Sequence, residues 1–178
     1  MDDRLFPEEI NIIYDSKCNV CNLEISFLRK RDRRLAEKRC TDADAGKGQV
    51  PQPRLRFTDL ESSDYNPEDP ANGGVTYAQG MKSMHAVTAN GKVVSGVPVF
   101  HMAYEQVNLG WLFAVTKIAL IKRIADSLYD IFARYRTNIT RGQSVDSLIQ
   151  AYGEKKELEK QRKKELFDCD SCEKKVSN

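Results

Sequence analysis

The 178-residue sequence contains no long uncharged apolar run and almost no net charge, and each of these absences excludes a class of protein. A membrane-spanning helix needs about 20 consecutive apolar residues, whereas lysine or arginine at 117, 122 and 123 interrupts the most apolar stretch, 111–136. The short, acidic start MDDRLFPEEI does not resemble a signal peptide. Because the net charge is only +2, it does not indicate nucleic acid or an anionic membrane as a partner. We predict a soluble protein with one main domain and without such partners, and the sequence favours no particular oligomeric state.

The cysteines lack the even number and the spread of a secreted disulfide framework, because there are five of them. Four form two Cys-x-x-Cys pairs, Cys18/Cys21 and Cys169/Cys172, and we interpret Cys40, in or near a loop, as a bystander. In a reducing compartment such pairs indicate redox or metal chemistry rather than structural cross-links. We therefore expect the protein in the cytoplasm or in an organelle such as the plastid.

Apolar periodicity predicts an α/β domain in which a strand leads into a helix at the first cysteine pair. The β-branched run 10–14 is typical of a buried strand, and from Asn19 the pattern changes to that of an amphipathic helix. Asn90–Gly91, between two apolar runs, predicts a β-hairpin with a tight turn. The other expected elements are a strand at 54–60, a helix from Pro98 to about Val107 and a mostly helical segment at 111–136.

Composition divides the chain into three parts. Residues 1–9 are an N-terminal extension, and residues 10–150 are the domain, with an irregular insertion at 60–80 that is rich in proline and glycine. Residues 151–178 are a charged tail that carries the second cysteine pair. Within the tail, 154–164 has 6 basic and 3 acidic residues among 11, which indicates a solvated single helix or a disordered segment.

Cys18 and Cys21 stand where the strand is expected to become a helix, and this placement suits a redox-active dithiol. Residues three apart on a helix share a face, with Cβ atoms about 5–6 Å apart, which is compatible with the geometry of a disulfide. The free amides and the dipole of a helix N-terminus favour a thiolate, and the pKa of such a cysteine falls from about 8.5 to between about 3.5 and 7.5. We expect Cys18, exposed at the turn, to attack a substrate disulfide, and Cys21 to resolve the mixed disulfide.

Asp15 ends the strand three residues before Cys18. Its carboxylate suits two roles that do not exclude each other: it caps the helix, or it orients Cys21 and receives its proton as that thiol attacks. The dithiol itself carries the electrons, so no bound cofactor is expected. The expected substrate is a disulfide-containing protein or a small thiol compound.

The signature at Asp15, Cys18 and Cys21 resembles that of the DCC family of predicted thiol-disulfide oxidoreductases, a thioredoxin-like group named for Asp-x-x-Cys-x-x-Cys. The similarity continues in RFTDL, in MHAVTANGKVVSG and in the helical half that follows AYEQVNLGWLF, so it covers about 10–141. The resemblance implies a thioredoxin-like α/β fold with a four-stranded mixed sheet, flanking helices and a helical C-terminal half. It also implies thiol-disulfide oxidoreductase activity at Cys18 and Cys21.

The sequence departs from the family pattern at three places. Ser16 stands where members usually have a glycine, so serine must make a turn that usually tolerates a positive φ. No proline precedes the hairpin strand that would face the cysteines, because Pro98 comes too late. The proline–glycine break that is usual in the helical half is also missing, since KIALIK runs through that position.

Other assignments of the cysteines stay open. The tail pair, Cys169 and Cys172, has acidic neighbours that raise a thiol pKa. This pair exchanges with the first pair as an internal shuttle, completes a four-cysteine zinc site with it, or is inert. A third class of function is a non-catalytic, redox-sensing interaction module. His85 and His101 are interpreted as structural or surface groups rather than metal ligands, and the basic run 29–34 as the solvated face of the first helix.

Overall fold

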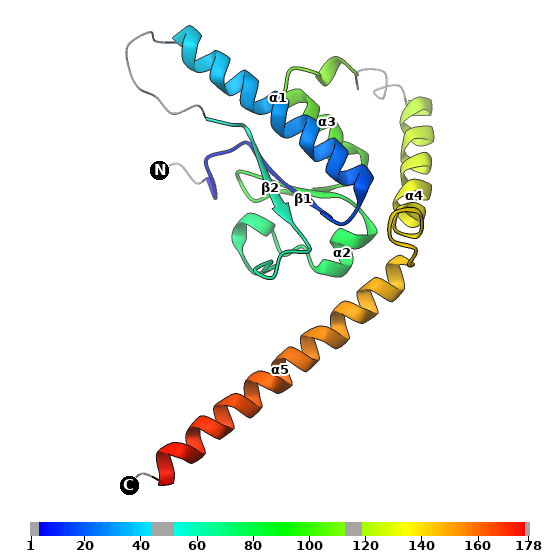
Figure 1. Ribbon diagram of the computed structural model, residues 1–178. Coiled ribbons are helices and arrows are strands. Elements are labelled where there is room, and N and C mark those ends of the chain that lie inside the picture. The colour runs from blue at the N-terminus through cyan, green and yellow to red at the C-terminus, as the bar shows by residue number, and fades with distance from the viewer. Residues whose placement is uncertain (1–3, 44–51, 113–118, 177–178) are drawn as a thin grey trace.

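The computed structural model describes residues 4–43, 52–112 and 119–176 (Figure 1). The elements in chain order are β1 (Ile10–Tyr14), α1 (Asn19–Ala43), β2 (Leu55–Asp59), the 3-10 helix η1 (Pro70–Asn72), α2 (Tyr77–Lys82), β3 (His85–Thr88), β4 (Val93–Ser95), α3 (Val97–Gln106), α4 (Ala119–Arg141) and α5 (Val145–Val176). The first strand, the helix at the first cysteine pair, the second strand and the hairpin therefore lie where the sequence predicts them.

The four strands form one mixed sheet in the order β2-β1-β3-β4. β1 runs parallel to β2 and antiparallel to β3, and β3 and β4 form an antiparallel hairpin. Parallel neighbours need a long crossover, which α1 supplies, whereas the hairpin needs only the short turn at Asn90–Gly91, where Gly91 has a φ of 82°. This sheet with its flanking helices confirms the expected thioredoxin-like α/β fold.

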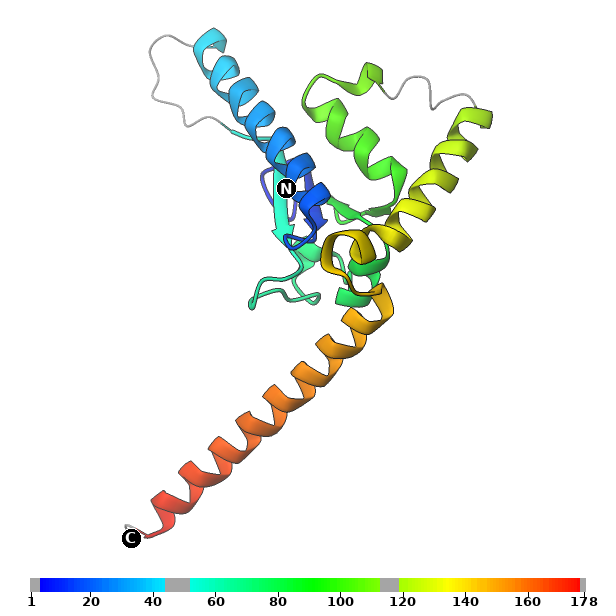
Figure 2. The same ribbon diagram turned by 45° about the vertical axis from the view of Figure 1, so that its right-hand side comes forward.

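Each face of the sheet has its own buried cluster, because successive side chains of a strand point to opposite faces. Ile10 and Ile12 of β1 face α1 and α3, whereas Ile13 faces α2 and the start of α5. Figure 2 shows α1 and α3 side by side on one side of the sheet and α2 on the other. Cys18 and Cys21 belong to the first cluster, so the cysteine pair is part of the core that joins α1 to the sheet.

The segment 60–80, expected to be irregular, contains η1 and the first turn of α2 and closes the second face of the sheet. Thr76 caps α2, and a capping box links its side chain and backbone to Gln79. Tyr65 and Val75 are buried. The apolar residues of this segment lie between turns and are buried against the sheet. Their spacing in the sequence therefore follows neither a helical nor a strand period.

The helix expected at 111–136 ends later in the chain than the sequence predicts. Residues 113–118 lie outside the described part, and α4 continues to Arg141, where Gly142 with a φ of 67° follows. A glycine in the left-handed region directly after a helix is a common stop. This later end places Arg141 in the helix, where it contacts Asp15. In the described part, no helix is both long and apolar enough to cross a lipid bilayer.

The basic run 29–34 is not solvated throughout. Asp32, in its middle, is 1% exposed. Its carboxylate accepts hydrogen bonds from the backbone N–H groups of Arg54 and Leu55, at 2.9 Å to Oδ2 in both cases. The run is therefore a solvated face interrupted by one inward carboxylate, which fastens α1 to the start of β2.

The charged tail is helical. α5 runs without a break across the boundary expected at 150, and its first two turns pack on the second cluster, where Tyr152 stacks on Tyr77 with ring centroids 3.8 Å apart. Beyond these turns α5 leads away from the domain (Figures 1 and 2). The side chains of Cys169 and Cys172 lie outside the described part, although their backbone belongs to α5.

Candidate redox site

Cys18 occupies the N-cap position of α1. Its carbonyl accepts a helical hydrogen bond from the backbone N–H of Asn22 at 2.9 Å, and its Sγ accepts from the backbone N–H of Cys21 at 3.4 Å. A sulfur in this position takes the place of the oxygen with which serine, threonine or aspartate caps a helix. The side chain that caps α1 is thus the thiol itself, and not the carboxylate of Asp15.

The pKa values of the two thiols are shifted in opposite directions. The hydrogen bond from the Cys21 thiol is the largest cause that lowers the pKa of Cys18, to about 6; burial opposes it, and the Cys21 backbone N–H and the charge of Arg136 add to it. The same hydrogen bond, together with burial, raises the pKa of Cys21. At neutral pH the pair therefore consists of a Cys18 thiolate and a Cys21 thiol.

Both cysteines are enclosed, which differs from the exposure expected for Cys18. Cys18 is 0% exposed and Cys21 is 3% exposed. α4, a distant part of the sequence, contributes to this enclosure, because its Tyr129 packs against the cluster that contains both cysteines. The hydroxyl of Tyr129 accepts a hydrogen bond from the backbone N–H of Met84 at 2.8 Å, and this bond ties α4 to the segment that leads into β3.

Arg136 of α4 is a buried cation beside Cys21. It is 3% exposed, and its Nη1 donates to the Cys21 Sγ at 3.1 Å. Its Nη2 donates to two backbone carbonyls of α2, at 3.2 Å to Gly80 and 3.1 Å to Met81. Among the ion pairs of the described residues, none includes Arg136. Of the groups that Arg136 contacts, only the dithiol can become negatively charged and so compensate the charge of the guanidinium.

Asp15 is buried at the end of β1, next to the site. Its Oδ1 accepts from the backbone N–H of Lys17 at 2.9 Å and pairs with Arg141. Its Oδ2 is buried and has no hydrogen-bond donor among the described residues. After the hydrogen bond to Cys18 and burial, the negative charge of Asp15 is a further cause that raises the pKa of Cys21. Asp15 thus shapes the turn before α1 and leaves one carboxylate oxygen unoccupied near the thiols.

Glu61, two residues after the end of β2, connects Arg141, the ion-pair partner of Asp15, with Lys17 and Tyr77. Its carboxylate binds Arg141 at 2.8 Å, Lys17 at 2.6 Å and the hydroxyl of Tyr77 at 2.8 Å. Burial opposes ionisation of Glu61, but the hydrogen bonds from Lys17, Arg141 and Tyr77 outweigh it and hold its pKa below the ordinary value. A cleft of about 310 Å³ opens beside this network toward the first turns of α5.

Ser16 makes its turn without a positive φ. Among the described residues other than glycine, only Asn108 has a φ in the left-handed region. The backbone N–H of Ser16 donates to Oδ1 of Asp59 at 3.1 Å, and its carbonyl accepts from the side chain of Asn22. These two bonds hold the turn in a conformation that serine adopts readily, so the departure from the usual glycine does not strain the backbone.

Sequence reasoning missed Glu61 and Arg141 and found no role for Arg136, although Arg136 lies in the region of family resemblance. A signal for Arg136 exists: it follows Tyr129 by seven residues and Ala133 by three, which places it on the inward face of α4. An arginine on such a face is rarely buried without a partner. Nothing comparable marks Glu61, whose partners come from three distant parts of the chain.

The remaining candidates lie apart from the dithiol. Cys40 follows Cys21 by 19 residues on α1, which is about 28 Å along the helix. The imidazole of His85 contacts the carbonyl of Ser83 at 2.8 Å, and His101 lies 3.5 Å from Glu105 on its own helix. The described residues contain no group of three or more histidine, cysteine or acidic side chains placed to hold a metal ion.

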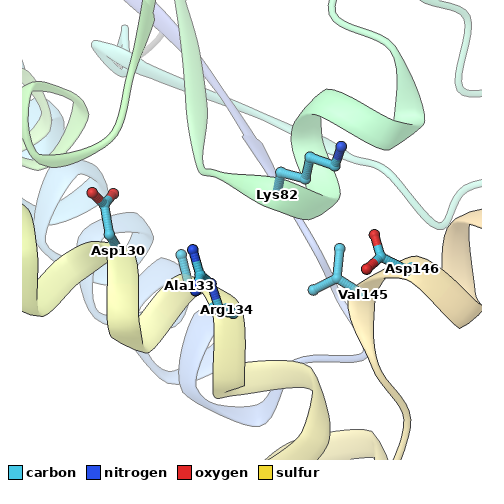
Figure 3. Close-up of a pocket in the computed structure, with 6 residues that line it drawn as sticks. All are labelled: Lys82, Asp130, Ala133, Arg134, Val145 and Asp146. Carbon is cyan, nitrogen blue, oxygen red and sulfur yellow. The ribbon is translucent and has the colours of Figure 1, made fainter.

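A cavity of about 590 Å³ lies between α2, α4 and the start of α5 (Figure 3). Its lining residues are Lys82, Asp130, Ala133, Arg134, Val145 and Asp146. The lining offers charges of both signs and no thiol, so it supplies no thiol redox group. The chemistry that the fold does supply is at the N-terminus of α1.

The fold and the dithiol define a thioredoxin-like protein with a Cys-x-x-Cys pair at a helix N-terminus. The model of the DCC1-like thiol-disulfide oxidoreductase family matches residues 12–142, and the chain belongs to this family. The chain is also similar to the "uncharacterized protein At5g50100, chloroplastic" of Arabidopsis thaliana, with 35% identity over 143 residues. That match covers 80% of this chain and 58% of the relative, so the chain spans less than two thirds of the relative's length. No solved structure is significantly similar to the chain.

Proposed function

We propose that the protein exchanges or reduces disulfides through Cys18 and Cys21, with Cys18 as the nucleophile. The observation that carries this proposal is the position of the Cys18 sulfur. It caps α1 and accepts hydrogen bonds from both the backbone and the thiol of Cys21, and the pKa of Cys18 is about 6. Membership of a thiol-disulfide oxidoreductase family supports a redox role independently.

The reaction has two displacement steps. The Cys18 thiolate attacks one sulfur of a substrate disulfide, so that the substrate S–S bond breaks, a Cys18–substrate bond forms and the first substrate sulfur leaves as a thiolate. Cys21 then loses its proton and attacks the Cys18 Sγ, which releases the second substrate sulfur. The dithiol becomes a Cys18–Cys21 disulfide, and two electrons have passed to the substrate. A reductant of the dithiol class restores the starting state.

Asp15 is the group that we assign to receive the proton of Cys21 in the second step. Its Oδ2 is buried and has no donor among the described residues, whereas its Oδ1 is held by Lys17 and Arg141. One oxygen thus fixes the carboxylate and the other is available as an acceptor. Because a base must lie within reach of the proton that it removes, this assignment needs Asp15 and Cys21 to be adjacent, as their electrostatic interaction supports.

Cys18 is completely enclosed, so a substrate reaches its sulfur only when part of the surrounding structure moves. We assign this movement to α4 and call α4 the cover of the dithiol. The contacts that hold the cover are those of α4, from Tyr129 to Met84 and from Arg136 to α2. Local opening of a few contacts is a common step in proteins. The substrate class is a disulfide-bearing protein or a small disulfide, and the chloroplastic relative supports an organelle as the compartment.

The test is turnover of a model disulfide, such as glutathione disulfide, with dithiothreitol as the electron source. Cys18→Ser should abolish turnover, and Cys21→Ser should accumulate a mixed disulfide with Cys18 that mass spectrometry detects. Cys40→Ser is the matched control, because that cysteine lies on the same helix, and it should retain turnover. Turnover that survives Cys18→Ser would show that the nucleophile lies elsewhere.

A further inference from the structure

We propose that Arg136 is a fixed cation that poises the Cys18–Cys21 pair toward its reduced form and so makes the oxidised pair a stronger oxidant of partner dithiols. This inference rests on the proposed function, because it concerns the redox equilibrium of the same pair. It adds which redox state of the pair is favoured, which neither the fold nor the family resemblance supplies.

The position of Arg136 is fixed independently of the sulfurs. Two hydrogen bonds to the carbonyls of Gly80 and Met81 hold the guanidinium, and its Nη1 then points at the Cys21 Sγ at 3.1 Å. The carbonyls are neutral and keep these bonds in either redox state. Since Arg136 is 3% exposed, water does not solvate its charge when the sulfurs change.

Reduction of the pair creates a negative charge close to Arg136, which has no ion-pair partner among the described residues. The disulfide takes up two electrons and, at neutral pH, one proton; the S–S bond breaks, Cys18 becomes a thiolate and Cys21 a thiol. Arg136 then donates to the Cys21 sulfur, and the Cys21 thiol donates to the Cys18 sulfur. Hydrogen bonds that end on an ionised group are among the stronger ones, and charged donors in a chain strengthen one another.

Oxidation removes this compensation. In the disulfide both sulfurs are neutral and the Cys21 S–H is gone, whereas the guanidinium stays buried. A buried charge without a partner is costly, so the oxidised form is raised in free energy relative to the reduced form. Arg136 therefore shifts the equilibrium toward the dithiol, which means a less negative reduction potential. Electrons pass readily from a partner dithiol to the oxidised pair.

The measurement is the equilibrium between the Cys18–Cys21 pair and dithiothreitol redox buffers at pH 7, with thiols counted by alkylation and mass. All proteins are full-length and carry serine at 40, 169 and 172, so that only the first pair titrates. In Arg136→Met the equilibrium constant should shift at least about tenfold toward the disulfide, which is about 30 mV toward more negative potential. Arg136→Lys should retain most of the wild-type value. Arg134→Met removes an exposed arginine of the same helix and should leave the constant unchanged.

The outcomes separate the two proposals. If the wild type forms no Cys18–Cys21 disulfide in any buffer, the proposed function fails. If the disulfide forms but Arg136→Met has the wild-type equilibrium constant, the function stands and the role of Arg136 is wrong. Should Arg136→Met not fold, Arg136→Gln decides the matter, because it keeps a polar amide on this side chain while the charge is gone.

Discussion

Arg141, at the end of α4, forms an ion pair with Asp15, at the end of β1, although 126 positions of the sequence separate them. The side chains are 9% and 0% exposed. A second bond from Arg141 to Glu61 extends the pair to the loop after β2. The helical C-terminal half is therefore anchored by charge beside the turn that presents Cys18.

Loss of Arg141 should destabilise the domain strongly, because Asp15 would remain buried without its cation. Breaking one side of a buried pair costs about 3–5 kcal/mol, and we expect Arg141→Met to lower the free energy of unfolding in urea by about 3 kcal/mol. Arg33→Met is the matched control, since Arg33 pairs with Glu37 on the exposed surface of α1, where a pair contributes about 0.5 kcal/mol or less. Equal losses in the two variants would contradict the anchoring role.

The ion pair between Asp15 and Arg141 also predicts how a variant changed at both residues behaves. Asp15→Asn removes the buried negative charge and keeps an oxygen that can accept from the backbone of Lys17. Combined with Arg141→Met, it should recover part of the stability that Arg141→Met loses, so the two effects should not add. Additive losses in urea unfolding would mean that the contact contributes nothing.

The acidity of Cys18 is directly measurable. In reduced protein with serine at 40, 169 and 172, thiolate absorbance at 240 nm should titrate with a midpoint at about pH 6, and this transition should vanish when Cys18→Ser is added. Cys21→Ala removes the thiol hydrogen bond, which is the largest cause of the lowered pKa, so its midpoint should move upward toward the ordinary value of about 8.5. A wild-type midpoint near 8.5 would contradict the arrangement at the helix N-terminus.

Linkage gives the sign of the effect of pH on stability. The pKa of Cys18 is lower in the folded protein than in the unfolded chain, so its contribution to stability is fully present above the unfolded pKa and is lost as pH falls through about 6. The difference in free energy of unfolding between the wild type and Cys18→Ser should therefore grow from pH 5.5 to pH 8. Higher pH is avoided because the raised pKa of Cys21 then acts in the opposite direction.

Local patterns placed the first strand, the helix with the dithiol and the hairpin correctly, because each rests on neighbouring residues. The β-branched run before Asp15 and the Asn90–Gly91 turn are signals of this kind. The enclosure of Cys18 and the two arginines beside the site depend instead on where α4 packs, more than 100 residues later in the chain. A helical period shows which face of α4 is inward, but it does not show which part of the fold that face meets.

The packing of α4 over the dithiol should open more easily when the contact of Tyr129 to Met84, just before β3, is weakened. Tyr129→Phe keeps the ring and removes the hydroxyl that accepts from Met84, a bond that contributes about 1 kcal/mol. If local opening exposes Cys18, alkylation of that thiol by iodoacetamide should accelerate about fivefold at pH 7. Tyr135→Phe is the control, because Tyr135 lies on the same helix and is 52% exposed. Equal rates in all three proteins would mean that α4 does not gate access.

The second cysteine pair should take no part in exchange within the same chain. Cys169 follows Tyr152 by 17 residues on α5, which is about 25 Å of helix, and Tyr152 itself is held by its stack on Tyr77. An unbroken α5 therefore carries the tail pair away from α1. The variant with serine at both 169 and 172 should turn over a model disulfide at the wild-type rate, and its zinc content should equal that of the wild type. A disulfide between Cys18 and Cys169 within one chain, trapped when Cys21 and Cys172 are replaced by serine, would show that α5 bends back and that the tail is a shuttle.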